Sequence, residues 1–399
     1  MDTEMASRLK KRRMEGNVER EWLYAIMKIC TYLDESHITL TPVKIECCNA
    51  LSATSFPKAF CDTKPYEARL LFGDVFQNGI SVLRDFEESK KVPEDRQTLF
   101  IFNKLMDFLS GGRSLNILDP LKLRSISDSE MTVLVANHLL GKLTASSCYL
   151  INSNCSGKRG DHCFCGKDVC KLTGNYGDTS IGNPEVWHGS LDIIIHNDVA
   201  VEALDEQPNT SETPGGKSPV EVKVKATRLK NTQIIAQTIV FSFLQKKRHP
   251  DREHFITPCI GIGRSELIVM LYDSEHDVLL ESSTIPLFEN EFSCEFSYCA
   301  ILVSWLTVNY QYFCSGLVEK YKMYKSNFFD IAKEKITVYE EKLQFQNVNS
   351  CQFLELRFKN PPVNIKPDVS PFMHETQKAL FDKYLRLNRS DDKGSDEKN

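Results

Sequence analysis

The sequence has no apolar run long enough to cross a membrane. Its longest, residues 300–308, is far shorter than the roughly 20 apolar residues of a spanning helix and lies next to polar residues. Met1 to Glu4 bring charge at once in place of an apolar segment, so we expect no secretory signal. Both absences favour an intracellular protein of the nucleus or cytoplasm that has no membrane partner.

An excess of positive charge is missing as well. The chain has 49 Lys and Arg against 54 Asp and Glu, which gives a net charge of −5 at pH 7. This balance excludes a histone-like, uniformly basic nucleic-acid binder, although it leaves room for a local basic groove. The fourteen cysteines, without a secretory signal before them, are expected to be free thiols in a reducing compartment.

Length and hydrophobic patterning divide the chain into several parts. At about 150 residues per domain, 399 residues predict two or three globular units. Helical spacing of apolar residues at 66–86 and 95–110 makes residues 1–120 a mostly helical N-terminal region. We expect a core at 121–290, a helical C-terminal region at 291–387 and a disordered, charged tail at 388–399.

Two β-rich runs carry acids where a strand facing a core should be apolar. In the first, Asp192 precedes three isoleucines. In the second, residues 219–225, valines alternate with Glu221 and Lys223, which therefore point to the same face of one strand. Burying a carboxylate beside an ammonium costs several kcal/mol unless something compensates. A divalent cation held by Asp192 and Glu221, with Lys223 beside it, would supply that compensation.

Helical and strand patterns surround these two runs. Residues 127–130 form a capping-box pattern at the start of an apolar helix that ends near residue 143. A second helix, 231–246, carries Gln233 and Gln237, which share a face because they are four residues apart. Strands are predicted at 148–151, 254–262, 266–273 and 277–284.

Three motifs follow one another along the chain: Gly189-x-x-Asp192, Glu221-x-Lys223 and Gln233-x-x-x-Gln237. Together they resemble the PD-(D/E)XK nuclease superfamily, and most closely its RecB-like and λ-exonuclease-like branch, whose signature is G-x-x-D, E-x-K and Q-x-x-x-Y. The chain differs in having Gln237 where tyrosine is usual and a long insert between the two acidic strands. The resemblance covers about residues 127–285. It implies a mixed α/β fold with a restriction-endonuclease-like αβββαβ core and a mixed central sheet, flanked by helical N- and C-terminal regions.

The resemblance also implies a function, that of a metal-dependent nuclease hydrolysing phosphodiester bonds in nucleic acid, with DNA favoured over RNA. Asp192 and Glu221 would hold Mg²⁺ or Mn²⁺, and the backbone carbonyl of Val222 would be a further ligand. Lys223 would orient or deprotonate the attacking water. Gln233 would position the site or the substrate backbone.

Several residues near the motifs have two interpretations. Glu130 is a candidate for a further metal ligand, or it closes the capping box of its own helix. His188 lies four residues before Asp192, but a histidine beside a tryptophan on a strand more often packs or hydrogen-bonds. Lys225 contacts phosphate or merely lies at the end of its strand. Further candidates are Gln237 for substrate contact and Glu185 as an additional acid.

A cysteine-rich insert at 154–182 contains Cys155, Cys163, Cys165 and Cys170, with His162 among them. Such a group suits a structural zinc ion, which prefers tetrahedral sulfur and nitrogen ligands. The insert is rich in Gly, Lys and Asp and has few apolar residues for a core, so zinc would be useful there as a staple. The spacing matches no standard C-x-x-C pair, and the alternative is a set of reduced loop thiols.

Residues 198–218 are rich in Pro, Gly, Ser, Thr and acids. This composition predicts a disordered surface loop. As a connection between two strands it is long, so we interpret it as an insertion at the edge of the sheet, without chemistry of its own.

Two other functional hypotheses stay open beside the nuclease. In the first, the chain keeps the fold as a catalytically inactive nucleic-acid-binding or scaffold protein, which the acidic balance favours. In the second, it is a zinc-stabilised interaction module. Cleavage of nucleic acid with and without a divalent cation, together with metal analysis, separates the three.

Overall fold

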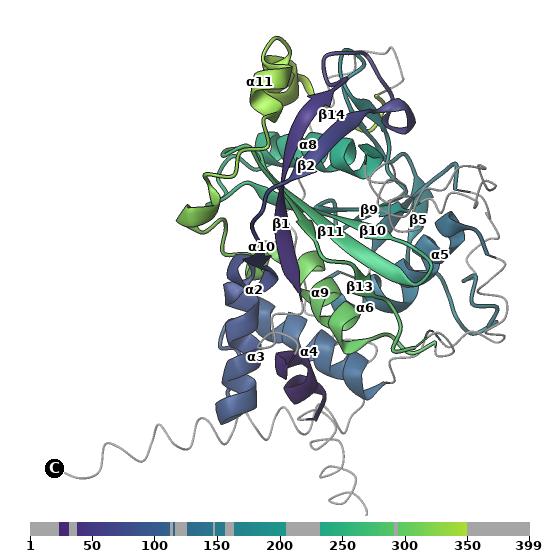
Figure 1. Cartoon of the computed structure of the whole chain (residues 1–399). Helices are drawn as coiled ribbons and strands as arrows, with labels where there is room; N and C mark the ends of the chain where they lie inside the picture. Colours follow the sequence, from purple (N-terminus) through teal and green to yellow (C-terminus); the bar gives the residue numbers. More distant parts are fainter. Residues whose placement is uncertain are drawn as a thin grey trace, which may run out of the picture.

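The computed structural model describes residues 24–31, 38–111, 115, 126–146, 148–155, 163–204, 232–290 and 294–348. In this part of the chain, helices pack on both faces of a mixed sheet, which confirms the expected mixed α/β class (Figure 1). No helix within these ranges is both long enough and apolar enough to cross a membrane.

A mixed β-sheet forms the centre of the protein. Its strands, in spatial order, are β2 (Cys61–Pro65), β1 (Thr39–Cys48), β12 (Val278–Ser282), β11 (Glu266–Asp273), β10 (Ile256–Ile262), β9 (Val199–Ala203), β8 (Ile193–Ile195), β4 (Tyr149–Asn152) and β5 (Asn175–Gly177). Two short strands, β3 (Leu70–Leu71) and β13 (Ile285–Pro286), pair with β1 and β11. Neighbours are parallel at β9–β10 and β4–β5, and antiparallel elsewhere in this order.

Helices cover both faces of this sheet. They are α2 (Phe72–Val75), α3 (Gln77–Ser89), α4 (Arg96–Ser110), α5 (Asp128–Val135), α6 (Gly141–Leu143), α8 (Thr232–Arg248), α9 (Tyr298–Val308), α10 (Tyr310–Phe313) and α11 (Phe328–Ala332). The segments η1 (Phe56–Lys58) and η4 (Glu319–Tyr321) are 3₁₀ turns, and η3 (Ala136–Leu140) and η5 (Val338–Lys342) are π-helical. In Figure 1, α2, α3 and α4 lie together at the lower end of the molecule and α11 at the upper end.

Side chains on the two faces of the sheet belong to separate hydrophobic clusters. Ile193 and Val201 belong to the cluster that includes residues of α4, α5 and α9. Ile194 and Ala200 belong to the cluster that includes α8. Because successive strand residues point to opposite faces, the even-numbered residues of β8 and β9 face α8.

Local sequence patterns place most of the central elements correctly. A complete capping box of Ser127 and Glu130 begins α5, and α5, η3 and α6 follow one another to Leu143 as predicted. The predicted helix at 231–246 corresponds to α8. The strands predicted at 148–151, 254–262, 266–273 and 277–284 correspond to β4, β10, β11 and β12.

A second, smaller sheet contains the glycine of the G-x-x-D motif. It consists of β14 (Gln344–Phe345), β6 (Ser180–Gly182) and β7 (His188–Ser190), in this order. Gly189 in β7 has φ of +144°, and a Cβ there would lie 3.0 Å from the ring of Phe56. The glycine of the motif is therefore needed for backbone conformation and close packing.

In the N-terminal region, which we predict to be mostly helical over residues 1–120, the described residues combine helices with strands. Besides α2, α3 and α4 it contributes β1, which hydrogen-bonds to β12 in the main sheet. Residues 39–48 contain the buried Leu40, Val43 and Ile45 beside exposed polar residues, a pattern typical of a half-buried strand. Residues 1–23 lie outside the described residues.

The loop predicted at 198–218 begins too early, because residues 199–203 form β9. This strand is buried in the centre of the sheet, between β8 and β10. A tight turn leads into it, with His196 and Asn197 in the left-handed region at φ of 52° and 61°. The amide of Asp198 closes the turn by donating to the carbonyl of Ile195 at 3.0 Å. Residues 205–218 lie outside the described residues.

The C-terminal region is helical only in part. It contains α9, α10 and α11, but β14 also lies in it and pairs with β6. The tail predicted at 388–399 lies beyond the last described residue, Val348.

Candidate functional site

The β8–β9 hairpin places two acids opposite each other. In its antiparallel register Ile193 pairs with Val201, so the next pair is Asp192 and Glu202, which we call the acid pair. Both side chains lie on the face of the sheet that α8 covers. Like charges directly opposite each other destabilise an antiparallel pair of strands. This arrangement therefore needs compensation from its surroundings.

Hydrogen bonds tie each acid to the backbone of the other strand. The amide of Asp192 donates to Oε2 of Glu202 at 3.0 Å. The amide of Ala203 donates to Oδ2 of Asp192 at 2.9 Å. These reciprocal bonds fix both carboxylates at the end of the hairpin, close to each other and on the same face.

Glu202 is the more buried member of the acid pair. Only 6% of its surface is exposed, whereas Asp192 is half-buried. Burial, and after it the charge of Asp192, raise the pKa of Glu202 well above its ordinary value of 4.5. Hydrogen-bond donors act in the opposite direction, but burial is the larger effect.

Two glutamines of α8 lie at the acid pair. Nε2 of Gln233 donates to Oε1 of Glu202 at 2.7 Å. Gln237 is completely buried, and neither atom of its amide has a hydrogen bond of normal geometry. Its amide is nevertheless close enough to Glu202 to lower the pKa of that carboxyl. The predicted shared face of Gln233 and Gln237 thus faces the acid pair.

A thiol and the start of α5 lie beside the acid pair. Burial and then the charge of Asp192 raise the pKa of Cys155 to about 11, while the hydroxyl of Ser129 lowers it. The charges of Glu202 and Glu130 also raise the pKa of this thiol. Cys155 therefore lies within the electrostatic field of the acid pair.

The predicted metal site lies only partly within the described residues. Glu221, Val222, Lys223 and Lys225 fall in the range 205–231, outside them, and their roles stay predictions. The sequence motifs predict that Asp192 shares a cation with Glu221. Among the described residues, the acid that lies opposite Asp192 is Glu202. Leu204 stands two residues after Glu202, at the position where an E-x-K motif has lysine.

The remaining acid and histidine candidates have structural contacts. Glu130 closes its capping box, because its Oε2 accepts from the amide of Ser127 at 2.9 Å. Glu185 binds Nζ of Lys335 at 3.0 Å on the surface. His188 lies in β7, with Nδ1 at 2.8 Å from a backbone carbonyl. For Glu130 and His188 the geometry thus supports the structural interpretation.

Three of the four predicted zinc ligands lie together with a histidine. His138, Cys163, Cys165 and Cys170 each offer one ligand atom, and these atoms all lie within 4.8 Å of one another. We call this group the thiol–imidazole cluster. Cys155 is not part of it and lies at the acid pair instead. His138 comes from η3 and stands 25 residues before Cys163, so local cysteine spacing does not reveal it.

A group of Asp273, Glu275 and His276 also has metal-ligand chemistry, but it belongs to a turn. Oδ1 of Asp273 accepts the amides of Glu275 and His276 at 2.8 and 3.0 Å. Nδ1 of His276 lies 3.1 Å from Oδ2 of Asp273. These bonds close the connection between β11 and β12, and the turn accounts for the grouping.

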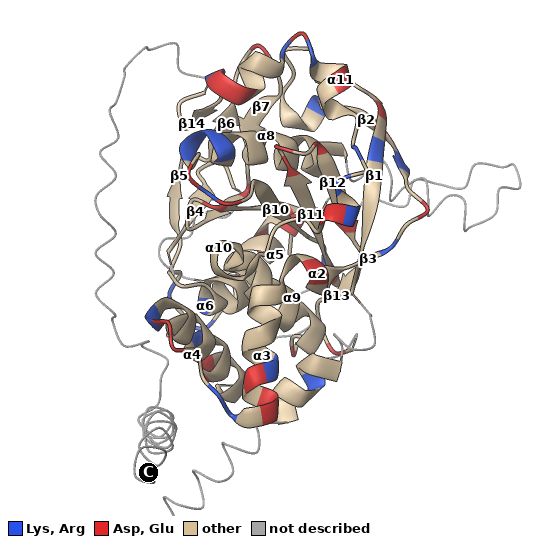
Figure 2. Cartoon of the chain, turned by 90° about the vertical axis from the view of Figure 1, so that its left-hand side faces the viewer, with Lys and Arg blue, Asp and Glu red and all other residues tan. Residues whose placement is uncertain are grey.

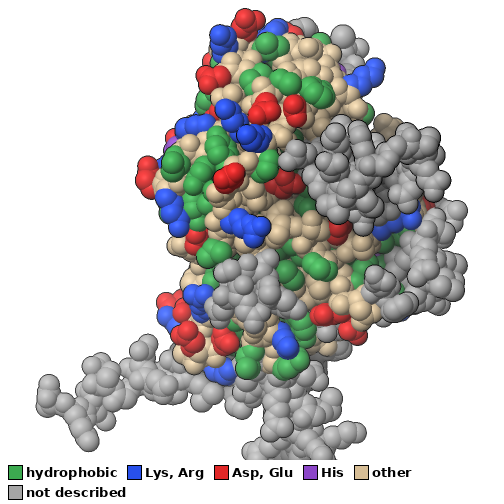
Figure 3. Space-filling model, viewed as in Figure 1, with side chains coloured by type: hydrophobic (Ala, Val, Ile, Leu, Met, Phe, Trp, Pro, Cys, Tyr) green, Lys and Arg blue, Asp and Glu red, His purple; other side chains and the backbone are tan. Residues whose placement is uncertain are grey.

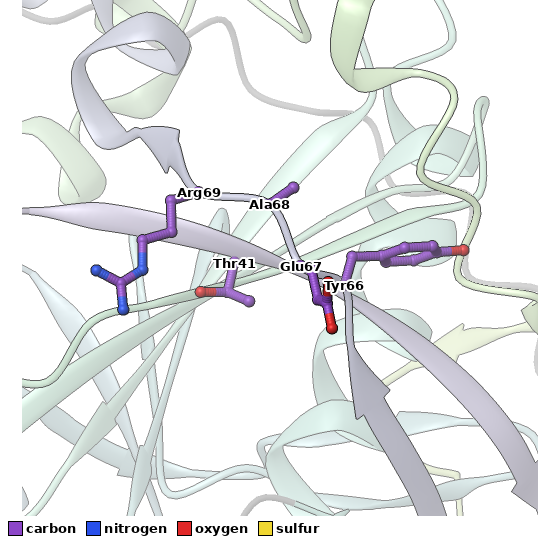
Figure 4. A pocket seen from close by; sticks show the side chains of 5 residues that line it. All are labelled: Thr41, Tyr66, Glu67, Ala68 and Arg69. Carbon is purple, nitrogen blue, oxygen red and sulfur yellow. The ribbon is translucent and has the colours of Figure 1, made fainter.

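A pocket of about 480 Å³ lies away from both groups (Figure 4). It is lined by Thr41 of β1 and by residues 66–69, which connect β2 to β3. Figure 4 shows Arg69 and Tyr66 extending in opposite directions from this connection. Strands β12, β11 and β10 separate β1 from the acid pair, so this pocket has no part in its chemistry.

Surface charge is mixed in the views shown. Figure 2 shows both Lys or Arg and Asp or Glu on α3. On the face drawn in Figure 3, basic and acidic side chains are interspersed. This mixture agrees with the small net charge of −5.

Comparisons with known proteins give no match: no family model, no curated protein and no solved structure matches the chain. We therefore infer function from the geometry of the acid pair and of the thiol–imidazole cluster. These two groups are built from different elements, the first from the β8–β9 hairpin and the second from η3 and residues 163–170.

Proposed function

We propose that the chain is a divalent-cation-dependent nuclease, which hydrolyses phosphodiester bonds in nucleic acid and prefers DNA to RNA. The acid pair carries this proposal. Two carboxylates stand opposite each other on neighbouring strands, and one of them is almost completely buried. The preference for DNA rests on the RecB-like resemblance of the sequence motifs.

The order of the elements supports membership of the PD-(D/E)XK superfamily. α5, β4, β8, β9, α8 and β10 follow one another as helix, three strands, helix and strand, which is the order of the αβββαβ core. The short strands β5, β6 and β7 are inserted between β4 and β8. In the proposed assignment, Glu202 takes the place that the sequence motif assigned to Glu221.

The donors of the acid pair suit a hard divalent cation. Carboxylate oxygens are preferred ligands of Mg²⁺ and Mn²⁺. Asp192 is half-buried, whereas Glu202 is enclosed by the sheet and α8. When bound, the cation would lower the pKa of a water and offset charge on the phosphate. Repulsion within the acid pair would be relieved at the same time.

Gln233 acts in this proposal as a positioning residue. Its amide holds Oε1 of Glu202, while the amide of Asp192 holds Oε2. The two bonds together fix the plane of the carboxylate. A neutral donor also favours the ionised form of Glu202, which is the form that binds a cation.

The attacking water also needs a group that orients it or accepts its proton. Leu204 cannot do so, although it occupies the position of the motif lysine. Lys223 remains the sequence-based candidate, with Lys225 as a possible phosphate contact. The amine would then come from the chain segment between β9 and α8.

Leu204, at the position of the motif lysine, also favours a second candidate function. A chain with Leu204 at the lysine position and an intact acid pair could bind nucleic acid without cleaving it. This is the catalytically inactive nucleic-acid-binding or scaffold protein. It predicts cation binding at Asp192 and Glu202 without turnover.

A cleavage assay decides between the two. The purified chain is incubated with single- and double-stranded DNA and RNA in Mg²⁺, Mn²⁺ or EDTA. We expect cation-dependent cleavage that falls at least about 100-fold in Glu202→Gln and in Asp192→Asn. The matched control is Glu281→Gln, which changes another acid whose pKa burial raises and should keep full activity.

The same assay tests the sequence-based residues through Glu221→Gln and Lys223→Ala. Loss of cleavage in Glu221→Gln, but not in Glu202→Gln, would restore the original pairing of Asp192. Cleavage that persists in both acid-pair variants would come from a contaminant and would contradict the proposed nuclease function. Nucleic-acid binding without any cleavage would leave the second candidate.

A further inference from the structure

We propose that His138, Cys163, Cys165 and Cys170 bind a structural Zn²⁺ ion. This site is separate from the proposed nuclease centre, since its ligands come from η3 and from residues 163–170. It also differs from the zinc site predicted from the sequence, because a histidine from a preceding helix replaces Cys155.

Distances within the thiol–imidazole cluster are close to those of a tetrahedral site. Nε2 of His138 lies 3.2 Å from Sγ of Cys163 and 3.7 Å from Sγ of Cys170. With Zn–S near 2.3 Å and Zn–N near 2.0 Å, tetrahedral geometry separates neighbouring ligand atoms by about 3.5–3.8 Å. The largest separation within the cluster, below 4.8 Å, requires only small side-chain movements.

The loop from Cys163 to Cys170 folds so that its three sulfurs meet. The amide of Cys163 donates to the carbonyl of Cys170 at 3.3 Å, which closes the loop. Gly166 has φ of +78° and supplies the left-handed turn that brings the chain back. The backbone amide of Cys165 also donates to the sulfur of Cys163, which holds these two cysteines together.

The histidine reaches this loop from a π-helical turn. η3 interrupts an otherwise α-helical segment between α5 and α6. Single π turns of this kind are rare and occur often at functional sites. His138 is 4% exposed, and Cys163 and Cys165 are 5% and 1% exposed. Burying an imidazole and two thiols in contact is readily explained by a shared metal ion.

Charge and hydrogen bonding around the cluster suit an anionic zinc centre. Three thiolates, one neutral imidazole and Zn²⁺ carry a net negative charge. The ammonium of Lys142 lies close enough to Cys163, Cys165 and Cys170 to interact with all three. Nδ2 of Asn137 lies 3.7 Å from Sγ of Cys170, as a donor to a metal-bound sulfur would.

Zinc at this position would attach the loop to the body of the protein. Asn137, next to His138, also accepts from Thr173 at 3.3 Å and from the hydroxyl of Tyr149 at 3.1 Å. Five residues after Cys170, β5 begins at the edge of the sheet beside β4. Residues 163–170 form no helix or strand themselves, so the ion would supply much of their order.

Metal analysis of the full chain tests the proposal. The protein is purified with a reductant, without added zinc and without chelator. We expect about one zinc ion per chain in the wild type and at least about tenfold less in Cys163→Ser and His138→Ala. Cys155→Ser is the matched control, because it removes a nearby half-buried thiol outside the cluster and should keep its zinc.

Two further measurements on the wild type cover variants that fail to fold. Replacement of zinc by Co²⁺ should produce a thiolate-to-cobalt charge-transfer band and the visible spectrum of a tetrahedral site. Chelation should increase tryptic cleavage at Lys167 and Lys171. A chain without zinc that also fails to bind Co²⁺ would overturn the proposal, as would full zinc content in Cys163→Ser. A disulfide between two of the three cysteines would also prevent zinc binding and would overturn the proposal. A thiol titration would detect it.

None of these measurements depends on nuclease activity. Loss of the zinc site would leave Asp192 and Glu202 on their hairpin. An inactive chain that contains zinc would contradict the proposed function but not this inference.

Discussion

The acid pair and the thiol–imidazole cluster both gather possible metal ligands, but the chain holds them in different ways. Asp192 and Glu202 are ten residues apart on two hydrogen-bonded strands of the central sheet. His138 and Cys170 are 32 residues apart, on a π-helical turn and on a short loop. The sheet therefore positions the first group, and a few turn hydrogen bonds position the second.

The two groups therefore depend on a bound metal ion in different ways. Ligands on paired strands stay in place without a cation, and their mutual repulsion lowers stability until one binds. Ligands on a loop lose conformational freedom only when the ion holds them, so ion binding contributes to folding. We expect removal of the divalent cation from the acid pair to abolish cleavage. Removal of zinc from the thiol–imidazole cluster should loosen the structure of the loop.

The largest expected effect is on cleavage, from changes in the acid pair. If the two acids hold one cation, the double variant Asp192→Asn/Glu202→Gln should be no slower than the single variants, each at least about 100-fold below wild type. Initial rates in saturating Mg²⁺ measure this. Losses that multiply in the double variant would show that the two acids act independently and would contradict a shared cation.

The next effect is on stability, from removal of zinc. Chelation should lower the thermal midpoint of the wild type by at least about 2 °C, because an ion that binds only the folded state stabilises it. Cys155→Ser should respond like the wild type, whereas Cys163→Ser should not respond. Thermal unfolding followed by circular dichroism, with and without a zinc chelator, gives these values. An equal response of all three proteins would place the zinc elsewhere.

A smaller effect on rate is expected from Gln233→Ala, about 10- to 100-fold, as for other residues that orient a metal ligand. Gln233 lowers the pKa of Glu202, so its loss should move the acidic limb of the pH–rate profile to higher pH. Gln233→Glu, in which a protonated carboxyl can still donate, should recover activity toward acidic pH. A pH profile that keeps its shape in Gln233→Ala would mean that this residue does not act through Glu202.

The smallest effect is a change of stability with pH. In the folded chain the pKa of Glu202 is raised, so the folded state binds the proton more tightly than the unfolded state does. Stability without cation should therefore fall as pH rises above the ordinary value of 4.5 toward the raised value.

Denaturant unfolding in EDTA at pH 5 and pH 8 checks this prediction. The difference in unfolding free energy between wild type and Glu202→Gln should favour the wild type more at pH 5 than at pH 8. Saturating Mg²⁺ should remove the difference between the two pH values. The opposite ordering in EDTA would mean that Glu202 is ionised and stabilised in the fold.

Some of these features could be predicted because they depend on neighbouring residues. The capping box of Ser127 and Glu130 and the shared face of Gln233 and Gln237 follow from helix geometry alone. The apolar runs of β10 and β11 likewise predict buried strands.

The sequence predicts a loop at Glu202, because an acid-, Pro- and Gly-rich stretch follows this residue directly. The local sign of a strand was present in Val199, Ala200 and Val201, which follow the turn at His196 and Asn197. Composition over the longer window outweighed these residues. The G-x-x-D motif identifies Asp192. The acid opposite it depends on the strand register, which the left-handed turn at His196 and Asn197 determines.

By itself the sequence determined the mixed α/β class, the helices with their caps and the acids and thiols available for chemistry, since these depend on composition and on short periodicities. Tertiary structure alone decided which of them meet. Thr39 bonds to Ser283 across 244 residues, and His138 meets Cys163 across 25, because contacts of that range arise from packing whole elements together. Asp192 likewise meets Glu202 because strand pairing, rather than local spacing, aligns the two side chains.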